Sequence, residues 1–265
     1  MISGLYTAAS GLVAQTQQQD VIANNLANVN TTGYKKDTAL YVPFPTVFLH
    51  RVNDAKVPMP NGIADAPIPV GKMGRGVQLR ADGVRPNITE EGSLIETGNK
   101  LNFAIKGNGM FVIQTPRGIR YTRDGSFNVD SEGMMVTDKG EPVLGQRGEI
   151  IIDGDELHVD EAGRVFVDNY EIDTLRIALF DKNSPLRKEG DNLFYTLDSA
   201  PLPEDDYVEF TGIMQGFLEQ SNVNVVHEMV DMISAYRAYE ASQKAVQAHD
   251  QTLEKAVNDV GNMQI

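Results

Sequence analysis

Several short segments of the chain contain residue types that could carry out catalysis or hold a ligand. His227-Glu228-Met229-Val230-Asp231 is nearest to the zinc-protease helix, in which two histidines one turn apart hold the metal and a glutamate activates water. Asp231 occupies the position of the second histidine, and the whole chain contains 4 histidines. The segment therefore predicts a solvated helix face rather than a zinc site.

The other segments also lack a group that their chemistry requires. Gly71-Lys72 resembles a phosphate-binding loop, but Ala66 replaces its first glycine and Met73 replaces the hydroxyl residue that binds magnesium. Gly107-Asn108-Gly109 leads into a strand pattern and so lacks the helix N-terminus that would hold a phosphate. Asp153-Gly154-Asp155-Glu156 lacks the alternating ligands of a calcium loop. The sequence predicts no enzyme, no cofactor and no metal site.

The composition excludes further classes of protein. The 265 residues include 23 Lys+Arg against 37 Asp+Glu, a formal net charge of -14. Because an acidic surface repels phosphate backbones, we expect no nucleic-acid partner. The chain has no cysteine, which excludes disulfides and thiolate chemistry. No apolar run reaches the length of a membrane span.

Apolar or small residues recur in steps of three and four at both ends of the chain. The N-terminal set consists of Ile2, Leu5, Ala9, Leu12, Thr16, Gln19, Ala23 and Leu26. The C-terminal set consists of Val225, Met229, Met232, Tyr236, Tyr239, Gln243, Val246, Asp250, Leu253, Val257 and Val260. This spacing places each set in one seam of a helix, as in coiled coils. Two amphipathic helices on an ordinary core would give a similar pattern, so both interpretations stay open.

The first helix is unusual in having almost no charge. Asp20 is the only charged side chain before Lys35. A helix covered by amides and small residues suits packing among other protein surfaces. The start Met1-Ile2-Ser3-Gly4 also lacks the basic residues of a secretion signal, so we expect no cleaved signal peptide.

The middle of the chain has the pattern of an antiparallel β domain. Short apolar runs such as Met110-Phe111-Val112-Ile113 and Ile150-Ile151-Ile152 indicate strands. Val129-Asp130-Ser131-Glu132-Gly133 and Val159-Asp160-Glu161-Ala162-Gly163 indicate hairpin turns. In such turns Asp bonds to its own backbone and Gly takes the positive φ that closes the turn.

These patterns predict a mainly β central body with N- and C-terminal α-helices that pair as a coiled-coil-like helical domain. Residues 1–32 and 222–265 are expected to form the helical assembly domain. Residues 33–76 are expected to be an extended, Pro-rich linker, because their prolines exclude a long helix. Residues 77–221 are expected to form the β-rich central domain.

Three segments, taken together, resemble a known family. Ala23-Asn24-Asn25-Leu26-Ala27-Asn28-Val29-Asn30-Thr31-Thr32-Gly33-Tyr34-Lys35 resembles the N-terminal signature of bacterial flagellar rod and hook proteins. Gln215-Gly216-Phe217-Leu218-Glu219-Gln220-Ser221-Asn222-Val223-Asn224, continued by Arg237-Ala238-Tyr239-Glu240, resembles their C-terminal signature. Ala104-Ile105-Lys106-Gly107-Asn108-Gly109-Met110-Phe111 and Tyr121-Thr122-Arg123-Asp124-Gly125 are similar to their shared β domain. Met110 departs from the family, which commonly has another aromatic or bulky residue there, but the change is conservative.

The resemblance points to a rod protein of the FlgF/FlgG type, because Gly145 to Gln215 leaves little room for the extra β domains of hook proteins. It implies a structural subunit of the flagellar basal-body rod that assembles helically and transmits torque from motor to hook. It implies partners among copies of itself, other rod and hook subunits and the flagellar type III export apparatus. The implied location is the basal body, outside the cytoplasmic membrane. Proximal and distal rod stay open as alternatives.

Two sets of residues are candidates for the assembly site. The predicted helix seams contain Leu5, Leu12, Leu26, Val225, Met229, Met232, Tyr236, Tyr239, Val246, Leu253 and Val257. The residues that match the family motifs are Asn24, Asn25, Asn28, Gly33, Ser221, Asn222, Asn224, Arg237 and Glu240. For the asparagines, helix capping and hydrogen bonding between subunits are equally open. We expect that a charge at Met232 or Leu253 blocks assembly.

A second function stays open as an alternative. A rod must pass the cell wall, so the chain could instead bind or hydrolyse cell-wall glycan. Glycoside hydrolysis requires two carboxylates held across a cleft. The sequence contains many acidic residues but shows no such pair, which favours the structural function.

Overall fold

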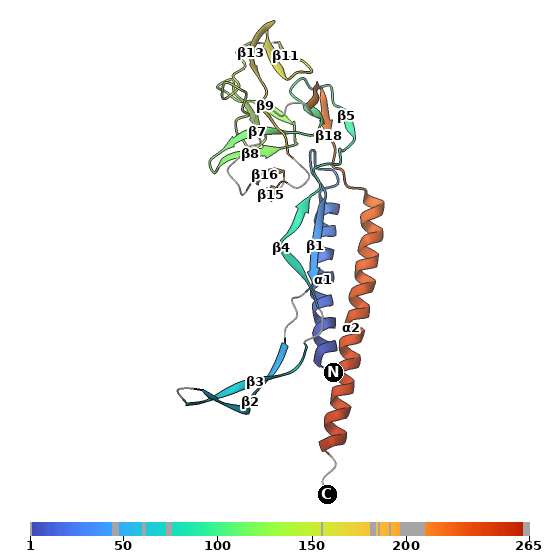
Figure 1. Cartoon of the computed structure of the whole chain (residues 1–265). Helices are drawn as coiled ribbons and strands as arrows, with labels where there is room; N and C mark the ends of the chain where they lie inside the picture. Colours follow the sequence, from blue (N-terminus) through green and yellow to red (C-terminus); the bar gives the residue numbers. More distant parts are fainter. Residues whose placement is uncertain are drawn as a thin grey trace. The chain divides into compact units, whose positions relative to one another are not determined.

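The computed structural model describes residues 2–43, 48–59, 62–72, 76–154, 156–180, 184, 186–190, 192–196 and 210–261 (Figure 1). The chain divides into two compact units. The helical unit consists of Met1–Ala23, Ala39–Val84 and Met229–Ile265. The β unit consists of Asn24–Thr38 and Arg85–Glu228. The predicted fold class, a mainly β body with an α-helix at each end, is confirmed.

Both predicted terminal helices are present, as α1 (Ile2–Ala27) and α2 (Val225–Gly261). A Cβ atom added at Gly4 would lie 2.6 Å from His249 Nε2, and one added at Gly11 would lie 3.4 Å from Ser242 Oγ. The helices therefore run antiparallel and lie close together at these glycines (Figure 1). Within the described residues, neither helix is apolar enough over its length to cross a membrane.

The predicted Pro-rich linker contains three strands in the structure. β1 (Asp37–Pro43) pairs with β4 (Val77–Pro86), and β2 (Phe48–Met59) pairs with β3 (Gly62–Lys72). Proline is compatible with such two-stranded ribbons because each strand has an outer edge that needs no N–H donor. The Tyr41 hydroxyl donates to Ala14 O of α1 at 3.1 Å, which ties β1 to that helix.

The β unit consists of several small antiparallel sheets. The largest has the strand order β14-β7-β8-β16-β15. Its strands are β7 (Met110–Thr115), β8 (Gly118–Thr122), β14 (Ile177–Ala178), β15 (Leu186–Glu189) and β16 (Leu193–Thr196). The smaller sheets are β9 (Phe127–Val129) with β10 (Met135–Thr137), and β11 (Leu157–Val159) with β12 (Arg164–Val167) and β13 (Tyr170–Thr174). Two more pair β6 (Phe103–Gly107) with β17 (Phe210–Gln215), and β5 (Leu94–Glu96) with β18 (Phe217–Glu219).

The core of the β unit consists of alternating apolar residues from these strands. Phe111 and Phe127 pack edge to face, with ring centroids 5.1 Å apart, and both are fully buried. A second cluster contains Met110 and Phe194 on the other face of the large sheet. Met110, the residue that departs from the family pattern, is 3% exposed and so lies at a core position.

Both predicted hairpin turns are confirmed. Asp130 Oδ1 accepts hydrogen bonds from the backbone N of Glu132 at 2.8 Å and of Met134 at 3.0 Å, and Gly133 closes this turn at φ +82. The turn at Asp160 repeats this arrangement, with Gly163 at φ +83. The predicted strand at residues 150–152 is wrong: only an isolated bridge between Ile151 and Met134 forms there.

Candidate functional site

The end of α1 and the loop that follows it form a buried ionic junction with β18 and the start of α2, inside the β unit. At its centre is Glu219, the last residue of β18, whose side chain is 1% exposed. Glu219 Oε1 accepts hydrogen bonds from Lys35 Nζ at 2.8 Å and from Gly92 N at 2.8 Å. Glu219 Oε2 pairs with Arg123 Nε. Both oxygens of this carboxylate therefore bind donors, as a buried charge requires.

The two cations that flank Glu219 are also held by backbone carbonyls. Lys35 Nζ donates to Glu90 O at 2.7 Å. Arg123 Nη2 donates to Ile105 O at 2.9 Å and to Gly107 O at 2.7 Å, which joins the guanidinium to β6. Burial lowers the pKa of Lys35, and the Glu219 carboxylate opposes that change. Each of the three charged groups of the triad Lys35–Glu219–Arg123 is thus held in place by hydrogen bonds.

A second group of charges lies on the other side of the loop. Lys36 Nζ pairs with Glu228, a residue in the first turn of α2 whose side chain is 1% exposed. Lys188 Nζ lies 2.9 Å from Asp37 Oδ2 and 3.7 Å from the centroid of the Tyr34 ring. Burial and the Asp37 carboxylate raise the pKa of Tyr34, so its hydroxyl stays a hydrogen-bond donor.

Amide side chains connect these charges to one another. Asn25 Oδ1 accepts from the Tyr34 hydroxyl at 3.1 Å and from Asp37 N at 2.8 Å, while its Nδ2 donates to Glu228 Oε2 at 3.3 Å. Asn222 Oδ1 accepts from Lys36 N at 2.6 Å. Asn25 thus links the N-terminal signature to the start of α2, and Asn222 links the C-terminal signature to the residue that follows the N-terminal signature.

Gly33 makes this close approach possible. Its φ of +66 lies in the left-handed region, and an added Cβ would lie 2.4 Å from Asp124 N. A side chain at position 33 would therefore be strained and would also collide with backbone. Gly33 N donates to Glu219 O at 2.8 Å, which places the loop against β18.

Comparison with known proteins matches the same three parts of the chain. Residues 5–35 match the family model for flagella basal body rod proteins, residues 104–167 the D1 domain of flagellar hook proteins FlgE/F/G, and residues 214–259 the C-terminal part of flagellar basal body rod FlgEFG proteins. The chain is 35% identical to the flagellar basal-body rod protein FlgG of Buchnera aphidicola (subsp. Acyrthosiphon pisum), over 96% of this chain and 98% of that protein. It is 37% identical to FlgG of Agrobacterium fabrum over 93% of this chain and 95% of that protein, and 33% identical to FlgF of Caulobacter vibrioides over 99% and 100%.

The chain belongs to the flagellar basal-body rod protein family. In this rod protein each matched segment supplies one member of the buried triad: Lys35 from the first, Arg123 from the second and Glu219 from the third. Relatives named FlgF and relatives named FlgG both match, so the choice between the two types stays open.

The predicted seam residues of the rod protein lie at different depths. Half-buried positions are Leu5, Leu12, Leu26, Val225, Met232, Tyr239, Val246 and Leu253. Exposed positions are Met229 at 49%, Tyr236 at 56% and Val257 at 69%. Of the other predicted motif residues, Arg237 is exposed and Glu240 is half-buried on α2.

The remaining motif residues make local hydrogen bonds. Asn224 Oδ1 accepts from His227 N at 3.1 Å and so caps α2. Asn28 Nδ2 donates to Asn24 O at 2.9 Å, one turn back on α1. Ser221 Oγ accepts from Val223 N at 3.3 Å. Bonds to a neighbouring subunit stay a prediction for these residues.

The sequence reasoning missed the charged residues of the junction, namely Lys35, Lys36, Asp37, Arg123, Lys188, Glu219 and Glu228. It also missed the exposed apolar residues Val226, Val230 and Ile233 of α2. The available signal was that Lys35, Arg123 and Glu219 each lie within a segment that resembles the family.

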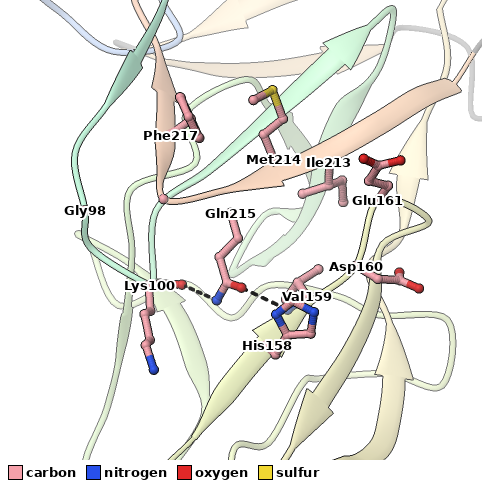
Figure 2. Close-up of a pocket in the computed structure, with 11 residues that line it drawn as sticks. Gly98, Lys100, His158, Val159, Asp160, Glu161, Ile213, Met214, Gln215 and Phe217 are labelled. Carbon is pink, nitrogen blue, oxygen red and sulfur yellow. Dashed lines mark hydrogen bonds between the residues drawn. The ribbon is translucent and has the colours of Figure 1, made fainter.

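Gln215 ties the C-terminal segment to another part of the β unit (Figure 2). Its Nε2 donates to Lys100 O at 2.8 Å and to Leu157 O at 3.1 Å, and its Oε1 accepts from Val159 N at 3.1 Å. The Gln215 carboxamide thus supplies hydrogen-bond partners for backbone N–H and C=O groups on the outer edge of β11. It lies in a shallow cavity of about 560 Å³ whose lining includes Lys100 and His158.

We expect Gln215→Leu to lower the free energy of unfolding by about 1–3 kcal/mol, because it leaves the Val159 N–H and two carbonyls without their partner. Urea denaturation of the monomer measures the change. Lys100→Ala is the matched control, because the Lys100 atom that bonds Gln215 is its backbone oxygen and its side chain is 67% exposed. Equal stability of Gln215→Leu and wild type would contradict the assignment.

Acid is expected to weaken the junction. Burial alone would raise the pKa of Glu219, but Arg123 and Lys35 together hold that pKa below its usual range. The folded-state pKa is thus below the unfolded value of about 4.3, so the stabilisation is present above that pH and is lost as pH falls through the folded pKa. Urea midpoints between pH 3 and 7 should fall more steeply for wild type than for Glu219→Gln. Parallel pH profiles would contradict this prediction.

Proposed function

We propose that this rod protein assembles helically with copies of itself and with other rod subunits, and that the assembled tube passes torque from motor to hook. Family membership makes the chain a structural subunit of the flagellar basal-body rod. It also favours this function over the glycan-binding or glycan-hydrolysing alternative. Head-to-tail contacts that do not close into a ring produce such an open helical assembly.

The observation that carries the proposal is an apolar stripe on α2. Val226, Met229, Val230, Ile233 and Tyr236 lie at positions i, i+3, i+4, i+7 and i+10 of the helix and so share one face, and each is between 49% and 71% exposed. Contiguous exposed apolar surface of this kind is typical of an interaction site. On α1, Tyr6 at 51% and Val13 at 59% lie seven residues apart and so share one face. These side chains would be buried by helices of neighbouring subunits.

Within one subunit, we propose that α1 and α2 pair in a coiled-coil-like manner. The close approaches at Gly4 and Gly11 support this pairing, because small residues let two helix backbones come together. The seam positions Leu5, Leu12, Met232 and Tyr239 are half-buried, as partial pairing requires.

Imaging of basal bodies tests the proposed assembly. A strain that lacks the chain should give basal bodies that stop at the rod, and the wild-type chain should restore a full rod. Purified wild-type chain should also form filaments that sediment. A deletion strain with complete rods would overturn the proposal.

Export and location follow from the family resemblance and are part of the proposal. We propose that the flagellar type III apparatus exports the chain without cleavage, and that the rod lies outside the cytoplasmic membrane. A bulky folded domain fused ahead of Met1 should block delivery. Mass spectrometry of basal-body protein should find the uncleaved N-terminal peptide, and a trimmed peptide would contradict the proposal.

A further inference from the structure

A polar cavity of about 430 Å³ lies in the β unit, apart from the ionic junction. The loop after α1 forms one wall, including Asn28, Asn30 and Thr32. Residues that follow β8 and β10 form the other walls, including Asp124 and Glu141. The start of β16 closes the cavity with Asn192 and Leu193. We call this site the acceptor pocket, because acceptor atoms dominate its lining.

The pocket has a net negative charge. Its lining contains three carboxylates, from Asp124, Asp138 and Glu141, and one basic residue, Lys139. Asp124 is held in place by Thr32 Oγ1 at 2.8 Å and Ser126 Oγ at 2.9 Å, which both donate to its Oδ1. The Asp124 carboxylate therefore has a fixed orientation before any ligand arrives, which lowers the entropic cost of binding.

Two buried oxygen atoms of the lining have no donor among the described residues, namely Glu141 Oε2 and Asn192 Oδ1. The orientation of the Asn192 amide is set by its Nδ2, which donates to Thr32 O at 2.8 Å and to Asp124 Oδ2 at 3.3 Å. Its Oδ1 is therefore the atom left without a donor. Buried acceptors in native proteins normally have a partner, so a positively charged group that is rich in donors would fit these two atoms and the neighbouring carboxylates.

We propose that the acceptor pocket receives the guanidinium group of Arg237 from a second copy of the chain. A guanidinium presents five N–H donors in one plane and stays charged, which matches several fixed acceptors better than an ammonium does. This inference rests on the self-assembly given under Proposed function, and it names the residues of one contact.

Arg237 is the cation that fits for two reasons. It is exposed, and it makes no hydrogen bond or ion pair with any described residue. It also continues the apolar stripe of α2, because it follows Ile233 by four residues and so lies on the same helix face. When the stripe packs on a neighbouring subunit, Arg237 is carried to that neighbour's surface.

Charge exchange tests the contact. Glu141→Arg alone and Arg237→Glu alone should each weaken self-association at least about 10-fold, as the loss of a charge-assisted hydrogen bond predicts. The double variant should recover most of the wild-type association. Arg187, on β15, is the matched control, because it is also exposed and unpaired among the described residues, and Arg187→Glu should leave association unchanged. Failure of the double variant to recover, or recovery with Arg187→Glu in place of Arg237→Glu, would overturn the proposal.

A second measurement separates this contact from self-assembly as a whole. A peptide of residues 226–247 is titrated into the full-length monomer while the amide signals of Asn192 and Glu141 are followed by NMR. The wild-type peptide should shift both signals and bind at least about 10-fold more tightly than the same peptide with Arg237→Gln. Equal binding of the two peptides, with normal filaments of the full chain, would overturn the pocket assignment alone. Peptide binding without filaments would instead contradict the proposed assembly.

Discussion

Glu219→Gln is expected to lower the free energy of unfolding of the β unit by about 3–5 kcal/mol. The substitution keeps the shape of the side chain but removes the charge that Lys35 and Arg123 share, and both cations remain buried at 1% and 2% exposure. An unpaired buried cation is far more costly than a surface one. Urea denaturation of the monomer at neutral pH measures the loss.

Glu156→Gln is the control for this prediction. Glu156 pairs with Lys100 at 3.6 Å, and the two side chains are 75% and 67% exposed, so its loss should cost less than about 1 kcal/mol. If Glu219→Gln and Glu156→Gln lower the free energy of unfolding by the same amount, the junction does not stabilise the fold, and its proposed structural importance is wrong.

Ile233→Asp is expected to reduce self-association by roughly 100-fold while the monomer stays folded, because a carboxylate would be buried without a partner in an apolar interface. Ile233 lies in the middle of the α2 stripe and is 55% exposed, so the monomer itself tolerates a charge there. Sedimentation of the purified protein measures association, and circular dichroism checks the fold.

Ser234→Asp adds the same charge one residue away. Successive residues of an α-helix are about 100° apart, so position 234 lies beside the stripe rather than in its middle. Normal filaments with Ser234→Asp and none with Ile233→Asp would support the stripe as the interface. Normal filaments with both variants would contradict it.

Local features of this fold could be predicted from the sequence because their causes are local. The turn at Asp130 and Gly133 depends on a side chain that bonds its own backbone and on a glycine with positive φ, and both are visible in five consecutive residues. The helices at each end were likewise predicted from their spacing. Residues 150–152 have the composition of a strand, but Ile151 is 52% exposed and finds no strand partner beyond one bridge.

The junction could not be predicted in this way because its partners are distant in the sequence. Lys35 and Glu219 are 184 residues apart, and a lysine in a polar loop is ordinarily exposed. Only the folded chain shows that the loop at Gly33 lies against β18 and so places Lys35 next to Glu219. On α2 the spacing predicted the helix but not which apolar stripe faces solvent, because Met232 and Ile233 belong to different stripes of one helix.

Amide hydrogen exchange on the monomer and on the polymer tests the central claim, that the two ends of the chain are assembly surfaces on a self-sufficient β unit. A helix whose apolar face lacks a partner is marginal in water and gains most of its stability from packing. Residues 5–23 and 229–257, the parts of the two helices that lie outside the β unit, should therefore exchange quickly in the monomer and slowly in the polymer, while β6, β7 and β8 stay protected in both. Strong protection of both helices in the monomer, unchanged on assembly, would contradict the account.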